Sequence, residues 1–243
     1  MKKWAPWLSL LGVALLALLL NYPVYALADR LAQATGGKVQ VLNSQGTVWA
    51  GQMQVGVSDG ARVYAIGEPL KWNFFVNQQS LWFGVRLAHP KLLGPLHLGL
   101  GSGGITVGEG EMRLPASWLG GLGAPFNTIR PEGLLQVRWQ GWQNGQDVNL
   151  RIQWQDAQSA LASIRPLGEY VITVTGNPDT KVNLDLRTNK GALQLEGQGH
   201  WSSGQRFVFS GYASSDERSR EALTGLLSQM GRREGDKYRL GVF

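Results

Sequence analysis

Residues 148–155 read Val-Asn-Leu-Arg-Ile-Gln-Trp-Gln, so apolar and polar side chains alternate at every position. A period of two is typical of an antiparallel strand with one buried face and one face toward water. The alternation recurs in residues 81–87, 135–139 and 181–187. A parallel sheet would instead show solid apolar runs. We therefore predict a mainly β fold, an extended and largely antiparallel amphipathic sheet that is open to a rolled or a duplicated form.

Two stretches within this β-rich region have a helical pattern. The first is short, Pro115–Leu122, and begins with a proline suited to the first helical position. The second carries an i, i+3, i+4, i+7 stripe of Leu223, Leu226, Leu227 and Met230, followed by a stop at Gly231. Ser214 and Glu217 have capping-box spacing, which predicts that this second helix begins at Ser214.

The N-terminal segment is apolar and uncharged. Lys2 and Lys3 precede an uncharged run from Trp4 to Ala28, which would be roughly 37 Å long as a helix and would cross the hydrocarbon core of a membrane. The two lysines place the N-terminus in the cytoplasm and the bulk outside. We predict a cytoplasmic tail (1–3), a transmembrane anchor (4–24), a juxtamembrane helix and linker (25–37) ended by a glycine pair, and an exported β-rich domain (38–243).

A cleaved secretory signal is the alternative interpretation of this segment. Lys2-Lys3 would form its basic region and Ala26-Leu27-Ala28 its cleavage site. The apolar tract exceeds the ~7–15 residues of a signal core and continues through Tyr22 and Tyr25, which suit a membrane interface. Both interpretations export the rest of the chain.

Composition narrows the classes of function. The chain has no cysteine, which excludes disulfides, thiolate catalysis and zinc–thiolate sites. The net charge of +6 falls to +4 when Lys2 and Lys3 are set aside, leaving 21 basic and 17 acidic residues of interleaved sign. A nucleic-acid partner would require a one-signed patch, and we expect none. The 33 glycines and ten tryptophans are typical of a β-rich protein with many tight turns.

The β-rich region contains signs of an internal duplication, with an offset of about 87 residues. Gly46-Thr47-Val48-Trp49 parallels Gly133-Leu134-Leu135-Gln136, and Lys71-Trp72-Asn73 parallels Gln153-Trp154-Gln155. The two repeats would cover about 38–123 and 124–243, each a run of strands that ends in a helix.

Each of the many predicted strands has one apolar face, and these faces must be shielded from water. Two short helices cannot cover them all, so the face must be covered by the sheet folding over itself, by a partner, or by lipid. Closure of the sheet is the commoner solution.

Sequence motifs typical of catalysis, cofactor binding or metal binding are either absent or lack the secondary structure that they require. Gly99, Gly101 and Gly104 match a dinucleotide-binding pattern, but strand-like residues follow where a helix is needed, so we predict a hairpin turn. The histidines are scattered without metal-ligand spacing, and no Gly-x-Ser-x-Gly elbow occurs. Glu109 and Glu111 would share the wet face of a strand. We predict no enzyme, and no catalytic, cofactor-binding or metal-binding residue.

The tryptophans suggest a surface for a partner. Trp139, Trp154 and Trp201 fall on the apolar parity of their strands and are expected in the core. Trp82 and Trp142 fall on the opposite parity from their apolar neighbours. Because tryptophan is enriched at interface hot spots, we predict these two as a partner surface, with capping of the sheet rim as the competing role.

Further stretches complete a pattern that spans nearly the whole chain: Leu114-Pro115 with Trp118-Leu119, Pro131-Glu132-Gly133-Leu134, Pro166-Leu167-Gly168-Glu169-Tyr170, residues 195–201, Phe209-Ser210-Gly211 and Leu223–Gly231. Together with the two-lysine N-terminus, the single apolar span and Gly46-Thr47-Val48-Trp49-Ala50-Gly51, they resemble the N component of the bacterial type II (general) secretion system. More distantly, the anchor and the repeated amphipathic strands resemble the AsmA-like inner-membrane proteins.

The first resemblance implies an accessory structural component of the secretion system. It would be a single-pass protein of the bacterial inner membrane with residues 38–243 in the periplasm, and its partners would be other secretion-system proteins and, through the N-terminal helix, the lipid bilayer. The family has no known catalytic residues or cofactor to carry over. The second resemblance implies the alternative, a protein that binds or transfers phospholipid in a β-sheet groove.

Overall fold

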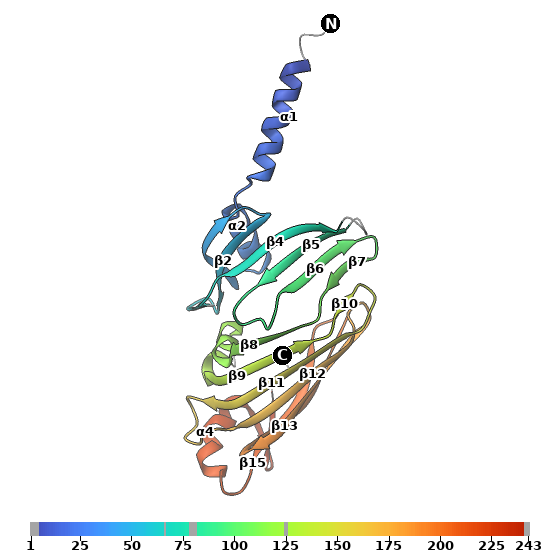
Figure 1. Cartoon of the computed structure of the whole chain (residues 1–243). Coiled ribbons are helices and arrows are strands. Elements are labelled where there is room, and N and C mark those ends of the chain that lie inside the picture. The colour runs from blue at the N-terminus through green and yellow to red at the C-terminus, as the bar shows by residue number, and fades with distance from the viewer. Residues whose placement is uncertain (1–4, 66, 78–81, 124–125, 241–243) are drawn as a thin grey trace.

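The computed structural model describes residues 5–65, 67–77, 82–123 and 126–240, and for residues 5–9, 77 and 82 it describes the backbone alone. The chain begins with two helices, α1 (Ala5–Leu20) and α2 (Tyr25–Ala34). Helix α1 projects from one end of the molecule, and the remainder is almost entirely antiparallel sheet (Figure 1). Among the described residues, no helix is both long enough and apolar enough to span a membrane.

The first sheet has eight strands, and all of its pairings are antiparallel. Its order is β1-β2-β4-β5-β6-β7-β10, with β3 paired to β2. The strands are β1 (Val39–Gly46), β2 (Ala50–Ser58), β3 (Val63–Ala65), β4 (Leu70–Asn77), β5 (Trp82–Ala88), β6 (Leu96–Gly101), β7 (Gly104–Val107) and β10 (Trp142–Gln143). The predicted turn at the glycine-rich segment is confirmed, because Gly101 pairs with Gly104 in a β6–β7 hairpin and Gly104 takes a φ of +89°.

The second sheet has nine strands in the order β16-β17-β15-β14-β13-β12-β11-β9-β8 and is likewise antiparallel. The strands are β8 (Gly110–Pro115), β9 (Pro131–Trp139), β11 (Val148–Ser159), β12 (Gly168–Asn177), β13 (Lys181–Gly191), β14 (Leu193–Ser202), β15 (Val208–Ser215), β16 (Gly231–Glu234) and β17 (Lys237–Leu240). The prediction of a mainly antiparallel β fold is therefore confirmed, and the described residues of all four alternating stretches lie in strands.

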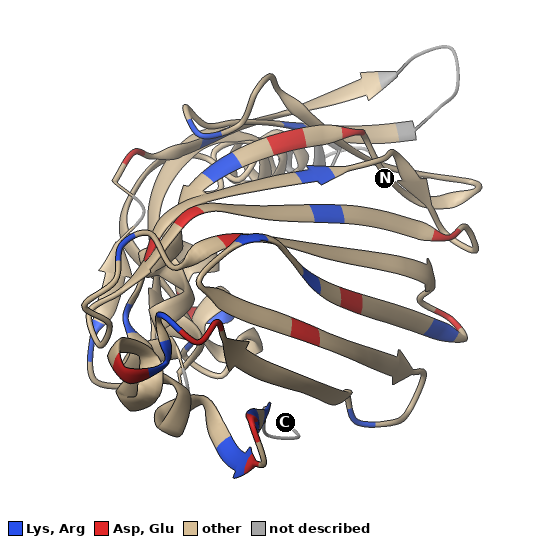
Figure 2. Ribbon diagram, turned by 90° about the horizontal axis from the view of Figure 1, so that it is seen from below, with Lys and Arg blue, Asp and Glu red and all other residues tan. Residues whose placement is uncertain are grey.

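The two sheets follow one another along the long axis of the molecule (Figure 1). The chain joins them through β10, which lies between β9 and β11 in sequence but pairs with β7 of the first sheet. Seen along that axis, the strands bow, and basic and acidic residues alternate over the ribbon without gathering by sign (Figure 2). Close approach at the junction requires a glycine at position 110, where an added Cβ would lie 2.3 Å from the ring of Trp139.

Three further helices lie at one end of the strands: η1 (Ala116–Leu122), α3 (Phe126–Ile129) and α4 (Arg220–Met230). The predicted Pro115–Leu122 helix is present as the 3-10 helix η1, for which Pro115 is the N-cap. The predicted capping box is wrong. Ser214 pairs with Gln194 inside β15, so strand pairing holds this segment extended, and α4 begins at Arg220.

The main hydrophobic core is confined to the helical end of the second sheet. Three residues of the predicted stripe of α4 are buried there, Leu223, Leu226 and Leu227, each at most 2% exposed, and the fourth, Met230, is half-buried. These side chains pack against a cluster from the neighbouring strands and loops that includes Leu167, Tyr170, Leu193, Leu195, Ala213 and Leu240. Helix α4 therefore covers the apolar face of the second sheet only at the helical end of its strands. It does not cover the opposite ends of these strands.

Candidate interaction surface

The turn at Gly46–Trp49 fastens the segment after α1 to the first sheet. The Val48 N–H donates to the Tyr22 carbonyl at 2.9 Å, and the Val24 N–H donates to the Gly46 carbonyl at 3.3 Å. Pro23 and Thr47 form an isolated bridge between these bonds. Val24 is only 2% exposed. A short antiparallel pairing of backbone groups thus holds the segment after α1 against the turn that precedes β2.

Two tryptophans complete this attachment. The Trp49 indole N–H donates to the Leu19 carbonyl in the last turn of α1, at 2.7 Å. The Trp72 indole N–H donates to the Val48 carbonyl at 3.0 Å. Trp49 also meets Phe74 edge to face, with ring centroids 5.6 Å apart. The Leu19 carbonyl also accepts the Tyr22 N–H at 3.3 Å in the turn that ends α1. The Trp49 bond therefore gives this carbonyl a second donor and couples α1 to the sheet.

An apolar hollow of about 550 Å³ opens beside this attachment, and we call it the α1-end hollow. It is lined by Leu19, Tyr22, Leu27, Val48, Trp49, Met53, Leu70, Trp72, Phe74, Val85 and Leu87. The lining comes from α1, α2 and the link between them at Tyr22, from strands β2, β4 and β5, and from the turn at Val48–Trp49. Directly paired residues of an antiparallel sheet share a face, and the pairs Trp72–Leu87 and Phe74–Val85 place these side chains together.

The apolar face continues past the hollow toward the hairpin ends of the strands. Val76, Phe83, Leu100 and Ile105 are paired in sequence across β4, β5, β6 and β7. Each is at least half exposed, from 50% for Ile105 to 63% for Phe83. We call these four residues the open apolar row. The expectation that the sheet covers its own apolar face is therefore wrong here, because the two sheets extend end to end.

The two predicted anchor residues lie near this row. Trp142 pairs with Val107 in β10, so it shares the apolar face and does not lie on the opposite one as its parity suggested. Its parity could not be carried over from β9, because the chain leaves one sheet and enters the other at this point. Trp142 is half-buried, and its indole N–H donates to the Gln146 carbonyl at 2.9 Å. Trp82 pairs with Asn77 at the start of β5, and its side chain lies outside the described part.

The three tryptophans predicted for the core are only half-buried. Trp139, Trp154 and Trp201 are all intermediate in exposure. Trp154 packs beside the buried ring of Tyr170, at 5.5 Å between centroids, while the Trp139 indole N–H donates to the Gly108 carbonyl at 2.8 Å. The strand register confirms that these tryptophans lie on the same face of the sheet as the core residues. Side chains on this face are less buried with increasing distance from α4.

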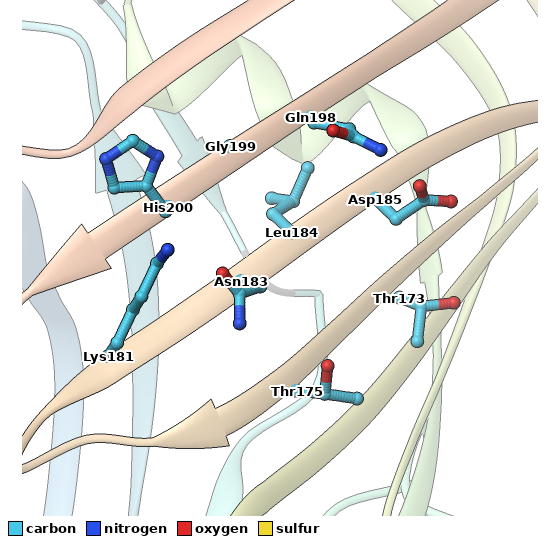
Figure 3. Close-up of a pocket in the computed structure, with 9 residues that line it drawn as sticks. All are labelled: Thr173, Thr175, Lys181, Asn183, Leu184, Asp185, Gln198, Gly199 and His200. Carbon is cyan, nitrogen blue, oxygen red and sulfur yellow. The ribbon is translucent and has the colours of Figure 1, made fainter.

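The opposite, polar face of the second sheet carries a separate shallow hollow of about 370 Å³ (Figure 3). Its polar side chains project from three adjacent strands: Thr173, Thr175, Lys181, Asn183, Asp185, Gln198 and His200. His200 lies opposite Asn183, and Asp185 lies opposite Gln198 and forms an ion pair with Arg187. Within the described residues, no group of three or more acidic or histidine side chains is arranged to hold a metal ion.

Glu111, one of the two glutamates considered for acid–base chemistry, is held in a hydrogen-bond network. Arg138 donates to Glu111 at 2.6 Å, and Gln136 donates to its other carboxylate oxygen. These hydrogen bonds, with the Arg138 bond contributing most, lower the pKa of Glu111 below its usual value. Glu111 is thus held ionised in a network across β8 and β9, which is the opposite of the raised pKa that a general acid needs.

The fold and its surfaces define a class: an extended antiparallel β protein that offers an apolar hollow and an open apolar row as its features for interaction. Residues 37–241 match the model of the family described as type II secretion system (T2SS), protein N, and the chain belongs to this family. The resemblance stated from the sequence is thereby confirmed. Neither the curated proteins nor the solved structures include a match to this chain.

The sequence motif that carried the resemblance has a clear place in the structure. Gly-Thr-Val-Trp forms the turn that receives the exit of α1. Sequence reasoning missed the α1-end hollow itself, since its lining is drawn from segments between Leu19 and Leu87. The available signal was the shared parity of the apolar residues in β4 and β5, together with the tryptophan at the end of the motif.

Proposed function

We propose that this member of the type II secretion family is an accessory structural component, an inner-membrane-anchored periplasmic β domain that docks on other secretion components during protein export. The observation that carries the proposal is the open apolar row, since exposed contiguous apolar surface marks sites of interaction. Family membership supplies the machine to which the partners belong.

The proposed anchor is the uncharged segment 4–24, with the N-terminus in the cytoplasm. Its support is the surface of α1, where the large apolar side chains from Leu10 to Leu20 are each more than half exposed. Such a surface is stable in hydrocarbon and costly in water. The division into a tail, an anchor, a helix with linker, and a β-rich domain of two repeats remains a prediction.

A second surface suited to docking is the outer edge of β1. Among the described strands, β1 ends the first sheet and has β2 as its one neighbour, and its eight residues carry no charge. Helix α2 lies beside its first half, where the Thr35 hydroxyl accepts the Val39 N–H at 3.1 Å. The segment from Leu42 to Gln45 is largely exposed and offers backbone groups that an added strand of a partner would pair with. By contrast, the short edge strand β16 carries Arg232, Arg233 and Glu234, which oppose such pairing.

The test is photo-crosslinking in cells that express the complete secretion system. A photoreactive amino acid is placed at Phe83, Trp142 or Leu42, with Arg151 on the polar face as a matched control. We expect adducts with secretion components from the first three positions and few from the control. If the three positions give no adduct with any secretion component, the docking role is excluded.

A second candidate function is binding or transfer of phospholipid along the apolar face. It is favoured by the same failure of closure, because a curved sheet with an uncovered apolar face forms a groove for acyl chains. Native mass spectrometry of the full-length chain tests it. Co-purifying phospholipid in stoichiometric amount supports lipid handling, and its complete absence under gentle detergent conditions argues against it.

A further inference from the structure

We propose that the α1-end hollow binds an acyl chain of a phospholipid drawn from the leaflet next to the C-terminal end of α1. This inference rests on the proposed function in one respect, the placement of α1 in the membrane. It deepens the second candidate function, phospholipid binding, by naming the site that holds the acyl chain and the route by which the chain enters. The hollow is a shallow, open concavity in the apolar face, and it differs from the open apolar row in being bordered by the end of α1 and by α2.

The first argument is the chemistry of the lining. Every lining side chain is aliphatic, aromatic or a thioether. The two indole N–H groups at the wall are already engaged, Trp49 by the Leu19 carbonyl and Trp72 by the Val48 carbonyl. The hollow thus presents apolar atoms and no charge to its occupant.

That chemistry discriminates between a lipid tail and a peptide. A peptide segment would bring backbone N–H and C=O groups, each of which costs free energy when it is buried without a partner. Protein interfaces meet this need with about one hydrogen bond per 100–200 Å². An alkyl chain has no polar group, so it is complementary to the hollow in both charge and hydrogen bonding. The volume of about 550 Å³ lies within the range of small-molecule sites, roughly 300–1,000 Å³.

The second argument is the position of the entrance. Leu19 belongs both to the exposed apolar surface of α1 and to the lining of the hollow. Tyr22, which is 41% exposed, stands beside it at the point where the helix gives way to the sheet. Tyrosine is enriched where membrane meets water. An acyl chain that leaves the leaflet along α1 therefore reaches Phe74 and Val85 without crossing a polar surface.

The attachment of α1 keeps this route in place. The Trp49–Leu19 bond and the bridge between Pro23 and Thr47 hold the end of α1 at the rim of the hollow. A flexible linker at this point would let the entrance drift away from the membrane surface. Trp49, the tryptophan of the Gly-Thr-Val-Trp motif, thereby lines the hollow and also holds the end of α1 beside it.

The experiment uses the full chain in vesicles of phosphatidylethanolamine and phosphatidylglycerol that contain a small fraction of phosphatidylcholine with a diazirine on its acyl chain. After irradiation, mass spectrometry locates the labelled residues. We expect label in α1 and also at Phe74, Val85 and Leu87. A second probe with the diazirine on the headgroup should leave those three residues unlabelled. Label in α1 with none in the hollow would overturn the inference and leave the anchor intact.

Variants test whether the labelling is specific to the hollow. Val85→Trp fills the hollow with apolar volume, and Phe74→Glu places a charge in it. Each should reduce labelling at Leu87 by about tenfold or more while label in α1 is retained, since a carboxylate or a filled cavity excludes an alkyl chain. The matched control is Leu161→Glu, which puts the same charge at an apolar position of similar exposure in another part of the chain. Unchanged labelling in both hollow variants would also overturn the inference.

The outcomes separate this inference from the proposed function. The unmodified chain carries the primary readout, so an unfolded variant does not remove the test. Absence of label from α1 would contradict the proposed anchor. Photo-crosslinks from Phe83 and Trp142 to secretion proteins report docking, and they are independent of label in the hollow.

Discussion

Tryptophan indoles bond to backbone carbonyls at several places in this protein, and all but the Trp142 bond join segments at least 22 residues apart. Five of the described tryptophans donate their N–H to a backbone carbonyl: Trp49 to Leu19, Trp72 to Val48, Trp139 to Gly108, Trp142 to Gln146 and Trp154 to Glu132. An indole combines a large apolar body with a single donor. It can therefore pack on the apolar face while it satisfies a carbonyl at the edge of that face.

Tyr170 likewise packs an aromatic ring in the main core while its polar group bonds to a backbone carbonyl. Its ring is 2% exposed, and its hydroxyl donates to the Leu193 carbonyl at 3.0 Å. We expect Tyr170→Phe to lower the free energy of unfolding by about 1–2 kcal/mol, because the buried carbonyl loses its side-chain donor. Urea unfolding of the full chain measures this change. A control substitution, Tyr64→Phe, removes a half-buried tyrosine hydroxyl from outside this core and should have a smaller effect.

Burial also gives Tyr170 a pH dependence. Desolvation raises the pKa of its hydroxyl well above the ordinary value of 10.0. A raised pKa in the folded state means that its contribution to stability is fully present below pH 10 and is lost as the pH rises above 10. Tyr170→Phe should therefore unfold with a flatter alkaline limb than the wild type when stability is measured from pH 9 to 11. Equal slopes in the two proteins would contradict this assignment.

At the scale of elements, the outer strands of the second sheet are held by a network on the polar face. Glu111 of β8 accepts bonds from Gln136 and Arg138 of β9, and Gln155 of β11 donates to Gln136 at 3.2 Å. The network therefore spans three adjacent strands. It lies where the second sheet meets the first, so it stabilises the boundary between them.

The network predicts an acid-dependent loss of stability. The pKa of Glu111 is lowered by its hydrogen bonds, the Arg138 bond first. A lowered pKa means that the contribution is present above the unfolded-state value of 4.5 and is lost as the pH falls through the folded-state value. Glu111→Gln should flatten the stability profile below about pH 4.5, which thermal melts from pH 3 to 7 would measure. Glu109→Gln is the matched control, and an identical flattening there would refute the assignment.

The junction between α1 and the sheet is a second feature at this scale. We expect Trp49→Ala to loosen α1, because the bond to Leu19 and the edge contact with Phe74 are both lost. The chain has no native cysteine, so spin labels can be attached at Leu15→Cys and Asn73→Cys without background. The distance distribution between them should broaden in Trp49→Ala and stay narrow in Trp142→Ala. A distribution unchanged by Trp49→Ala would show that the backbone bonds alone hold the helix.

At the scale of the whole molecule, stability and interaction are divided along the long axis. The core lies under α4 at the far end of the second sheet, while the open apolar row and the α1-end hollow lie in the first sheet (Figure 1). Regions with few buried apolar contacts open locally at low free-energy cost. The surface proposed for binding therefore lies in the part of the sheet with the least internal packing.

This division predicts that truncating an apolar side chain lowers stability in the core, and that a truncation in the open apolar row reduces partner binding instead. Leu223→Ala removes a fully buried side chain and should cost about 2–5 kcal/mol of unfolding free energy. Phe83→Ala removes a ring that is 63% exposed, and it should leave stability nearly unchanged while it reduces partner adducts. Hydrogen exchange should likewise be faster at the β4–β7 hairpin ends than in β12–β14. Faster exchange in β12–β14 would contradict the division.

Individual residues show where prediction from sequence succeeded and where it failed. The alternation over residues 148–154 correctly assigned faces along the first part of β11, before its register shifts, since a regular strand has a period of two. The prediction failed at Trp142, where the chain changes sheets, and at Ser214, where pairing with Gln194 overrides a helix cap. Both failures come from long-range pairing, which local spacing does not report.

The amino-acid sequence by itself determined that this is an antiparallel β protein, which side chains share a face, and the family to which it belongs, because these follow from local periodicity and from motifs contiguous in the chain. Only the tertiary structure decided that the sheets run end to end, that the apolar face stays uncovered beyond α4, and that Leu19 and Leu87 border the same hollow. Coverage of a surface depends on which distant segments meet, and that is settled by packing of the whole chain.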